Sequence, residues 1–246
     1  MSDSQNRFWQ IDTARGVAIV GMIIYHFLVD LEMIFHLPIG VYRFPLVLYA
    51  RIVASMFILL VGISAAIRYE KIRILGIKKV SKIFVRRSLL ILFWSGVISA
   101  VTFTMFRNET IVIGILHFIG ISMILIVPFL LLKNRIIVIL AMIFLGLGII
   151  IPSFKTTNYW LLPFGAVPRT FESFDYFPIF PWFGIVLIGV VLGRTFISKR
   201  LTVTKILPNK NTFLAKIGQK SLLIYLLHQP ILWSGLWMTD RLLSNR

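Results

Sequence analysis

Long runs of apolar residues, separated by short polar and basic segments, make up most of the chain. Most runs extend over about 17–24 residues, the length that a helix needs to cross a hydrocarbon core of about 30 Å. They lack the two-residue alternation of a membrane β-barrel. The pattern predicts an all-α, polytopic transmembrane helical bundle of about seven spans, at roughly residues 14–35, 45–67, 88–105, 111–132, 136–151, 177–196 and 221–237.

Composition agrees with this fold class. Of the 246 residues 58% are hydrophobic, and the mean hydropathy of +0.90 is too high for a soluble domain of this size. We expect one transmembrane domain over residues 1–246, without a cleavable signal peptide because the first apolar run is too long. The absence of cysteine excludes thiolate nucleophiles, disulfides and cysteine-ligated metals, and we expect no metal site.

The basic residues predict the orientation. The chain has a formal net charge of +17, and eight Lys or Arg with one acid lie between residues 68 and 87, while seven with no acid lie between 194 and 220. Both segments fall on the same side of the predicted bundle. The positive-inside rule then places the N-terminus in the cytoplasm and the C-terminus outside. Because these charges flank membrane spans, we expect an integral protein of a prokaryotic cytoplasmic membrane and no nucleic-acid partner.

Ionisable residues in the first span are the strongest functional signal. Arg15 and His26 are eleven positions apart, which brings them to within about 20° of one helical face and separates them by about 16 Å. Asp30 follows His26 at i+4 on that face and is placed to orient its imidazole. Arg51, inside the second span, needs an anion, and Asp30 or Glu32 is the expected partner.

Three further histidines are candidates. His117 and His228 lie within the fourth and seventh predicted spans, and His36 lies at the outer boundary of the first. If His26, His117 and His228 face one cavity, they define a buried polar site. Each of them is open to a structural reading as well, because a histidine in a span often packs and hydrogen-bonds a neighbouring helix; a solvated loop position is the alternative for His36.

Five motifs, in order, resemble the heparan-α-glucosaminide N-acetyltransferase catalytic-domain family: residues 11–22 with His26, 51–64, 114–118, 176–184 and 221–230. A broader similarity extends to acyltransferase family 3. The resemblance implies transmembrane transfer of an acetyl group from cytoplasmic acetyl-CoA, as co-substrate, to a sugar or lipid-linked acceptor on the far side. It adds Asp12 and Trp182 as substrate-binding or structural candidates. In the lysosomal member an asparagine matches His26 and the reactive histidine lies close to His36, so His26 and His36 are rival bases.

The residues themselves fit such a reaction. CoA is a polyanion, and Arg15, Arg86 and Arg87 lie where the basic side would contact its phosphates. His26 would act as the base or nucleophile, and His117 or His228 would polarise the thioester carbonyl. The alternatives are a proton-coupled secondary transporter or exporter, in which buried ionisable groups form the pathway, and a purely structural membrane subunit. Membrane lipids and a second copy of the chain are further candidate partners.

Overall fold

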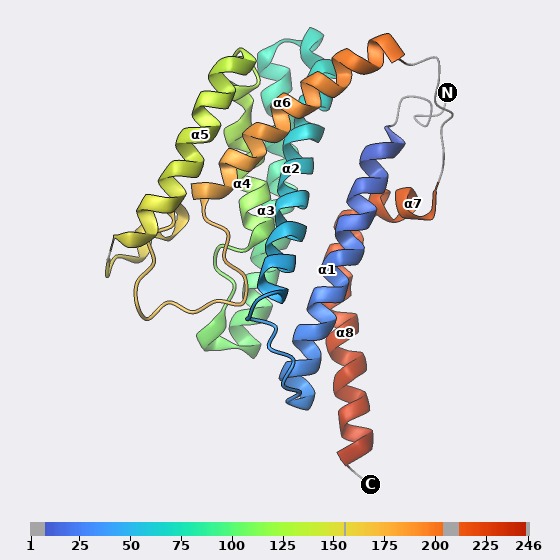
Figure 1. Ribbon diagram of the computed structural model, residues 1–246, viewed down its shortest axis with the longest axis vertical. Coiled ribbons are helices and arrows are strands. Elements are labelled where there is room, and N and C mark those ends of the chain that lie inside the picture. Colours follow the sequence, from blue (N-terminus) through green and yellow to red (C-terminus); the bar gives the residue numbers. More distant parts are fainter. Residues whose placement is uncertain (1–7, 155, 204–211, 245–246) are drawn as a thin grey trace. The chain divides into compact units, whose positions relative to one another are not determined.

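The computed structural model describes residues 8–154, 156–203 and 212–244, and over these it is helical with no strand (Figure 1). The all-α prediction is therefore confirmed for the described residues. Residues 204–211, within the second basic segment, lie outside them. The helices are α1 (Trp9–Phe35), α2 (Leu46–Ile72), η2 (Arg73–Leu75), α3 (Ile77–Met105), η3 (Arg107–Glu109), α4 (Ile115–Phe129), α5 (Asn134–Ile150), η4 (Ile151–Ser153), η5 (Tyr159–Phe164), α6 (Ile179–Val203), α7 (Phe213–Gln219) and α8 (Ser221–Ser244).

Five helices of the described part are long and apolar enough to cross a membrane, namely α1, α2, α3, α5 and α6. Most of the residues in their apolar windows are not buried within the protein, as expected of helices that face lipid. The protein is therefore an integral membrane protein. α4 is apolar but shorter, and the apolar run of α8 is interrupted by His228, Gln229 and Pro230, so the predicted count of seven spans stays a prediction.

The chain contacts divide into two compact units, residues 1–57 with 206–246 and residues 58–205. In the first unit α1 packs along α7 and α8. The crossing of α1 and α7 is close because both helices present glycine there: a Cβ on Gly16 would lie 2.0 Å from the Leu214 carbonyl oxygen, and one on Gly218 would lie 1.8 Å from that of Asp12. Whether the whole chain acts as a single domain stays a prediction.

In the second unit α3 packs on α4, and α6 packs on α5 and α4. The hydroxyl of Ser88 on α3 donates to the Gly120 carbonyl on α4 at 2.6 Å. Glycines again permit close approach: a Cβ on Gly62 of α2 would lie 2.0 Å from the Val186 carbonyl oxygen of α6, and one on Gly184 of α6 would lie 2.8 Å from that of Ala141. Glycine therefore permits close helix packing at these crossings.

Two prolines lie close to helix ends. Phe180, which precedes Pro181, has the extended angles φ −98° and ψ 128°, so α6 is kinked at its start. Pro128 lies in the last turn of α4, which ends at Phe129. The fourth apolar run is therefore only 15 residues of helix, shorter than the predicted segment 111–132, because Gly114 and Pro128 bound it.

Candidate functional site

A polar cluster lies between α1 and α8, formed by His26, Asp30, His228 and Gln229. The imidazole rings of His26 and His228 stand edge to face with centroids 5.0 Å apart. The Gln229 amide donates to Asp30 Oδ1 at 2.6 Å, and Asp30 is fully buried. The structure therefore brings together three of the residues predicted from the sequence, together with Gln229, which the sequence reasoning missed.

One hydrogen bond fixes the tautomer of His228. Its Nδ1 lies 2.6 Å from the carbonyl oxygen of Tyr225, one turn earlier on α8. Because a carbonyl only accepts, Nδ1 carries the proton and Nε2 presents its lone pair. Nε2 is buried and has no hydrogen-bond partner among the described residues. In the neutral ring, His228 therefore presents a desolvated nitrogen with a free lone pair, the form that a general base or nucleophile requires.

Two more acceptors of the cluster lack a donor. Asp30 Oδ2 and Gln229 Oε1 are buried and make no hydrogen bond within the described part of the chain. Buried polar atoms are nearly always paired, so unpaired acceptors on three residues of one cluster indicate a functional site whose residues are not chosen for stability alone. A ligand with N–H or O–H groups has the chemistry to complete them.

Two expected contacts are not formed. In the described part, Asp30 hydrogen-bonds Gln229 and not the imidazole of His26, so its predicted role in orienting that ring is not seen. The expected ion pair of Arg51 with Asp30 or Glu32 is also absent there, since Arg51 is exposed and a Glu32 oxygen accepts from the Val41 backbone at 2.9 Å. Glu32 thus bonds the Val41 backbone N–H in the loop after α1, and not the guanidinium group of Arg51.

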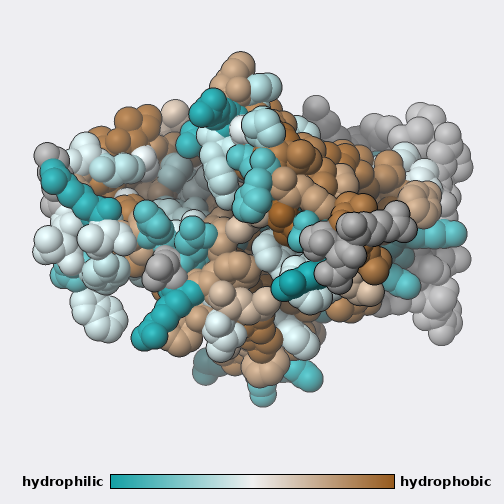
Figure 2. Space-filling model, turned by 90° about the horizontal axis from the view of Figure 1, so that it is seen from below, coloured by the Kyte–Doolittle hydropathy of each residue, from teal (hydrophilic) through white to brown (hydrophobic). Residues whose placement is uncertain are grey.

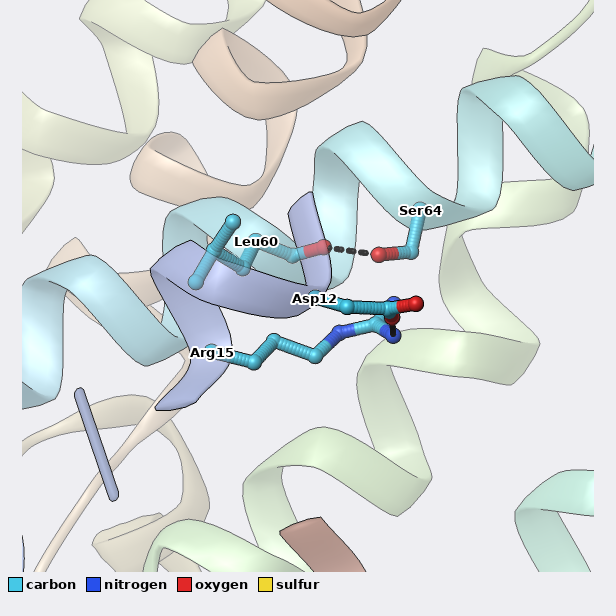
Figure 3. A network of polar contacts seen from close by, with 4 residues as sticks. All are labelled: Asp12, Arg15, Leu60 and Ser64. Atoms are coloured by element: carbon cyan, nitrogen blue, oxygen red, sulfur yellow. Dashed lines mark hydrogen bonds and ion pairs between the residues drawn. The ribbon is translucent and has the colours of Figure 1, made fainter. Parts of the chain in front are cut away.

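The other candidates of the first unit occupy the two ends of α1. Arg15 and the buried Asp12 form an ion pair of 3.1 Å at the N-terminal end (Figure 3). The same view shows the Ser64 hydroxyl donating to the Leu60 carbonyl within α2. His36 ends α1 with a left-handed backbone (φ 53°) and is exposed. It does not join the cluster around His228.

His117 lies in the first turn of α4, in the second unit, and contacts α3. The Ser99 hydroxyl donates to the Ile111 carbonyl at 2.5 Å and lies 3.3 Å from Nε2 of His117. Since the single hydroxyl proton is used on the carbonyl, His117 Nε2–H donates to Ser99 and Nδ1 keeps the lone pair. His117 therefore has the opposite tautomer to His228.

A loop carboxylate begins the helix of His117. Asp175 Oδ2 accepts from the Ile115 backbone N–H at 2.8 Å, an N-terminal cap contributed from far along the chain. Gly114 leaves room for this carboxylate, because a Cβ there would lie 2.6 Å from the same oxygen. A second hydrogen bond connects this loop to the segment before α4: the Phe177 N–H donates to the Ile113 carbonyl at 2.8 Å. Asp175 lies outside every predicted span, and the sequence reasoning missed it.

Desolvation by this loop raises the pKa of Asp175 from 3.8 to about 6, although the bond from Ile115 opposes the shift. Between about pH 4 and pH 6 the folded protein binds more protons than the unfolded chain, so the free energy of unfolding should fall as pH rises through that window. Asp175→Asn keeps an acceptor and removes the titration. We expect melting curves between pH 4 and 7 to show this decrease, on the order of 2 kcal/mol, in the wild type and not in Asp175→Asn; parallel profiles would contradict it.

The remaining candidates lie in the second unit. Arg86 and Arg87 are exposed neighbours on α3, at the end of the basic segment of residues 68–87. Trp182 lies in the first turn of α6, and its ring contacts that of Phe177 with centroids 4.7 Å apart. Its contacts are those of a packing residue at the start of the helix. Within the described residues no group of three or more His, Asp or Glu side chains is arranged to hold a metal ion.

Comparison with known proteins identifies a family for the chain. Residues 7–230 match the family model described as heparan-alpha-glucosaminide N-acetyltransferase, catalytic. The matched region contains α1, the polar cluster, His117 and the capping loop of α4. No curated protein and no solved structure matches the chain.

Proposed function

Because the chain belongs to the heparan-α-glucosaminide N-acetyltransferase catalytic-domain family, a family of membrane acetyltransferases, we propose that it transfers an acetyl group from cytoplasmic acetyl-CoA to the amine or hydroxyl of a sugar at the outer face. The observation that carries the proposal is the buried Nε2 of His228, which has no hydrogen-bond partner among the described residues and lies in one cluster with His26 and Asp30. The proposed orientation, with the N-terminus inside, rests on the distribution of basic residues.

The polar cluster supplies the chemistry. His228 Nε2 takes the proton of the acceptor N–H or O–H while the acceptor atom attacks the thioester carbon. The C–S bond then breaks, and the CoA sulfur leaves with the proton that the imidazole returns. Asp30 and Gln229 provide acceptors for the polar hydrogens of the sugar, and His26 lines the site next to His228. His228 is preferred to His26 as the base because a backbone carbonyl fixes its tautomer, whereas His26 has no hydrogen-bond partner among the described residues.

Arginines hold the donor. CoA carries phosphates, and the guanidinium group binds phosphate oxygens in a bidentate manner. Arg86 and Arg87 are exposed, adjacent and at the cytoplasmic end of α3 in the proposed orientation. Arg15 lies at the corresponding end of α1, where Asp12 orients its guanidinium group.

The donor test uses CoA itself. We expect CoA to raise the melting temperature of the purified protein, and Arg86→Ala/Arg87→Ala to weaken CoA binding about tenfold or more, since each charge-assisted hydrogen bond contributes about 1.5–3 kcal/mol. Arg107→Ala, which removes an arginine beyond the other end of α3, is the matched control and should bind CoA like the wild type. Unchanged stability with saturating CoA would contradict the proposal.

The second candidate function is proton-coupled transport, favoured by the same buried His and Asp residues. The two are separated by acetyl transfer from labelled acetyl-CoA to glucosamine in detergent, where no gradient exists. Product formation under those conditions supports the enzyme. Flux in vesicles that depends on a proton gradient and is independent of CoA would support the transporter instead.

A further inference from the structure

The short helix η5, Tyr159–Phe164, exposes large apolar and aromatic side chains, although hydrogen bonds fix its position. Trp160 is 86% exposed, the highest value among its neighbours, while Leu162 is buried. The Asn158 side chain caps the segment by accepting from the Trp160 backbone N–H at 3.0 Å. The Tyr176 hydroxyl donates to the Leu162 carbonyl at 2.7 Å. The exposed face is therefore built into the fold.

This face continues the lipid-facing surface of α5. Ile149 and Ile150 in the last turn of α5 are exposed, and Phe154 follows them, also exposed. Only a small part of the apolar window of α5 is buried within the protein. Figure 2 shows hydrophobic residues side by side with near-neutral and hydrophilic ones on the face seen from below. An apolar span that passes directly into exposed aromatic residues is typical of a membrane–water boundary.

We propose that η5 is an interfacial anchor that lies in the headgroup layer of the membrane at the end of α5, with Trp160, Leu161 and Phe164 in contact with lipid. Trp and Tyr favour this layer because their rings are apolar and their N–H and O–H groups are polar. Tyr159 is also exposed, and its hydroxyl lies 2.8 Å from that of Thr170.

The anchor holds a functional segment. Tyr176, which bonds η5, directly follows Asp175, whose carboxylate begins α4 at Ile115. The anchor thus fixes, at the level of the headgroups, the loop that caps the helix carrying His117. The proposal rests on α5 spanning a bilayer and not on acetyl transfer, so the two can fail independently.

Fluorescence quenching tests the anchor. The full chain and Trp160→Phe are reconstituted in phosphatidylcholine vesicles whose acyl chains are brominated either near the headgroup or near the methyl end. The chain has six tryptophans. The difference in fluorescence between the two proteins isolates the signal of Trp160 from that of the other five. We expect this difference signal to be quenched more by the bromines near the headgroup than by those near the methyl end, and to be little quenched by aqueous iodide.

A matched control is Trp182→Phe, because the ring of Trp182 packs against Phe177 within the protein. The signal removed by this substitution should show weaker quenching by the shallow bromines than that of Trp160. Strong iodide quenching of the Trp160 signal, with no effect of brominated lipid, would overturn the anchor. A Trp160 signal that changes with added glucosamine and not with brominated lipid would overturn it too, in favour of a sugar-binding face.

Discussion

Replacing His228 by asparagine is expected to lower acetyl transfer about 10²–10⁴-fold, the range that general acid–base catalysis contributes. The asparagine amide can still donate to the Tyr225 carbonyl, so the hydrogen bond that now fixes the imidazole is retained. What disappears is Nε2, the buried nitrogen that has no partner among the described residues. The loss should therefore appear in kcat, while the melting temperature and the affinity for CoA stay close to those of the wild type.

The same substitution distinguishes the rival histidines. His36→Asn is chemically matched and keeps a residue type that accepts the left-handed backbone found at this position. His26→Asn removes the neighbouring ring without touching the bond between His228 and Tyr225. If His228→Asn retains full activity while His36→Asn abolishes it, the reactive histidine is the exposed one at the end of α1, and the role proposed for His228 is wrong. Rates are measured as labelled acetyl transfer to glucosamine at saturating acetyl-CoA.

Helix periodicity predicted part of this site because it depends only on local geometry. His26 and Asp30 share a face at i and i+4, and both are found at the polar cluster. Their partners on α8 are almost 200 positions away in the chain, and depth along a span does not tell which helix faces which. The sequence therefore indicated that His228 was buried, and not that its ring would contact that of His26.

Two residues of functional interest escaped prediction for different physical reasons. Gln229 carries no charge, so its cost within a span is smaller and it attracted less notice than the histidine before it. Asp175 belongs to a loop, where a carboxylate needs no explanation until the fold shows it capping α4 at Ile115. The sequence does mark Gln229 as a polar residue within an apolar run. No feature of the sequence distinguishes Asp175 from other loop carboxylates.

The second large effect concerns the contact of α1 with α7. Gly218→Ala should destabilise the protein, because the added Cβ would lie 1.8 Å from the Asp12 carbonyl oxygen and 2.9 Å from the Gly16 nitrogen. Backbone atoms cannot rotate away as a flexible side chain would, so the two helices must separate. Overpacking of this kind costs about 1–3 kcal/mol and occasionally more, which exceeds the gain of about 1 kcal/mol in helix propensity.

Polar contacts between the two helices oppose their separation. The hydroxyls of Thr13 and Thr212 lie 3.2 Å apart, and the Thr212 side chain caps α7 at Ala215. α7 cannot shift without breaking these contacts, and the ion pair of Arg15 with Asp12 lies on the same turns of α1. We therefore expect Gly218→Ala to lower both the melting temperature and the affinity for CoA.

Gly235→Ala is the matched control, since a Cβ on this glycine of α8 meets no atom within 4 Å. It should be neutral or stabilise by up to about 1 kcal/mol through helix propensity. Gly16→Ala, whose Cβ would lie 2.0 Å from the Leu214 carbonyl oxygen, acts on the same crossing from the opposite helix. Once one substitution has separated the helices, the other has less contact left to disturb, so the double variant should lose less than the sum of the single losses. Equal melting temperatures for Gly218→Ala and Gly235→Ala would show that α7 does not pack on α1 in this way.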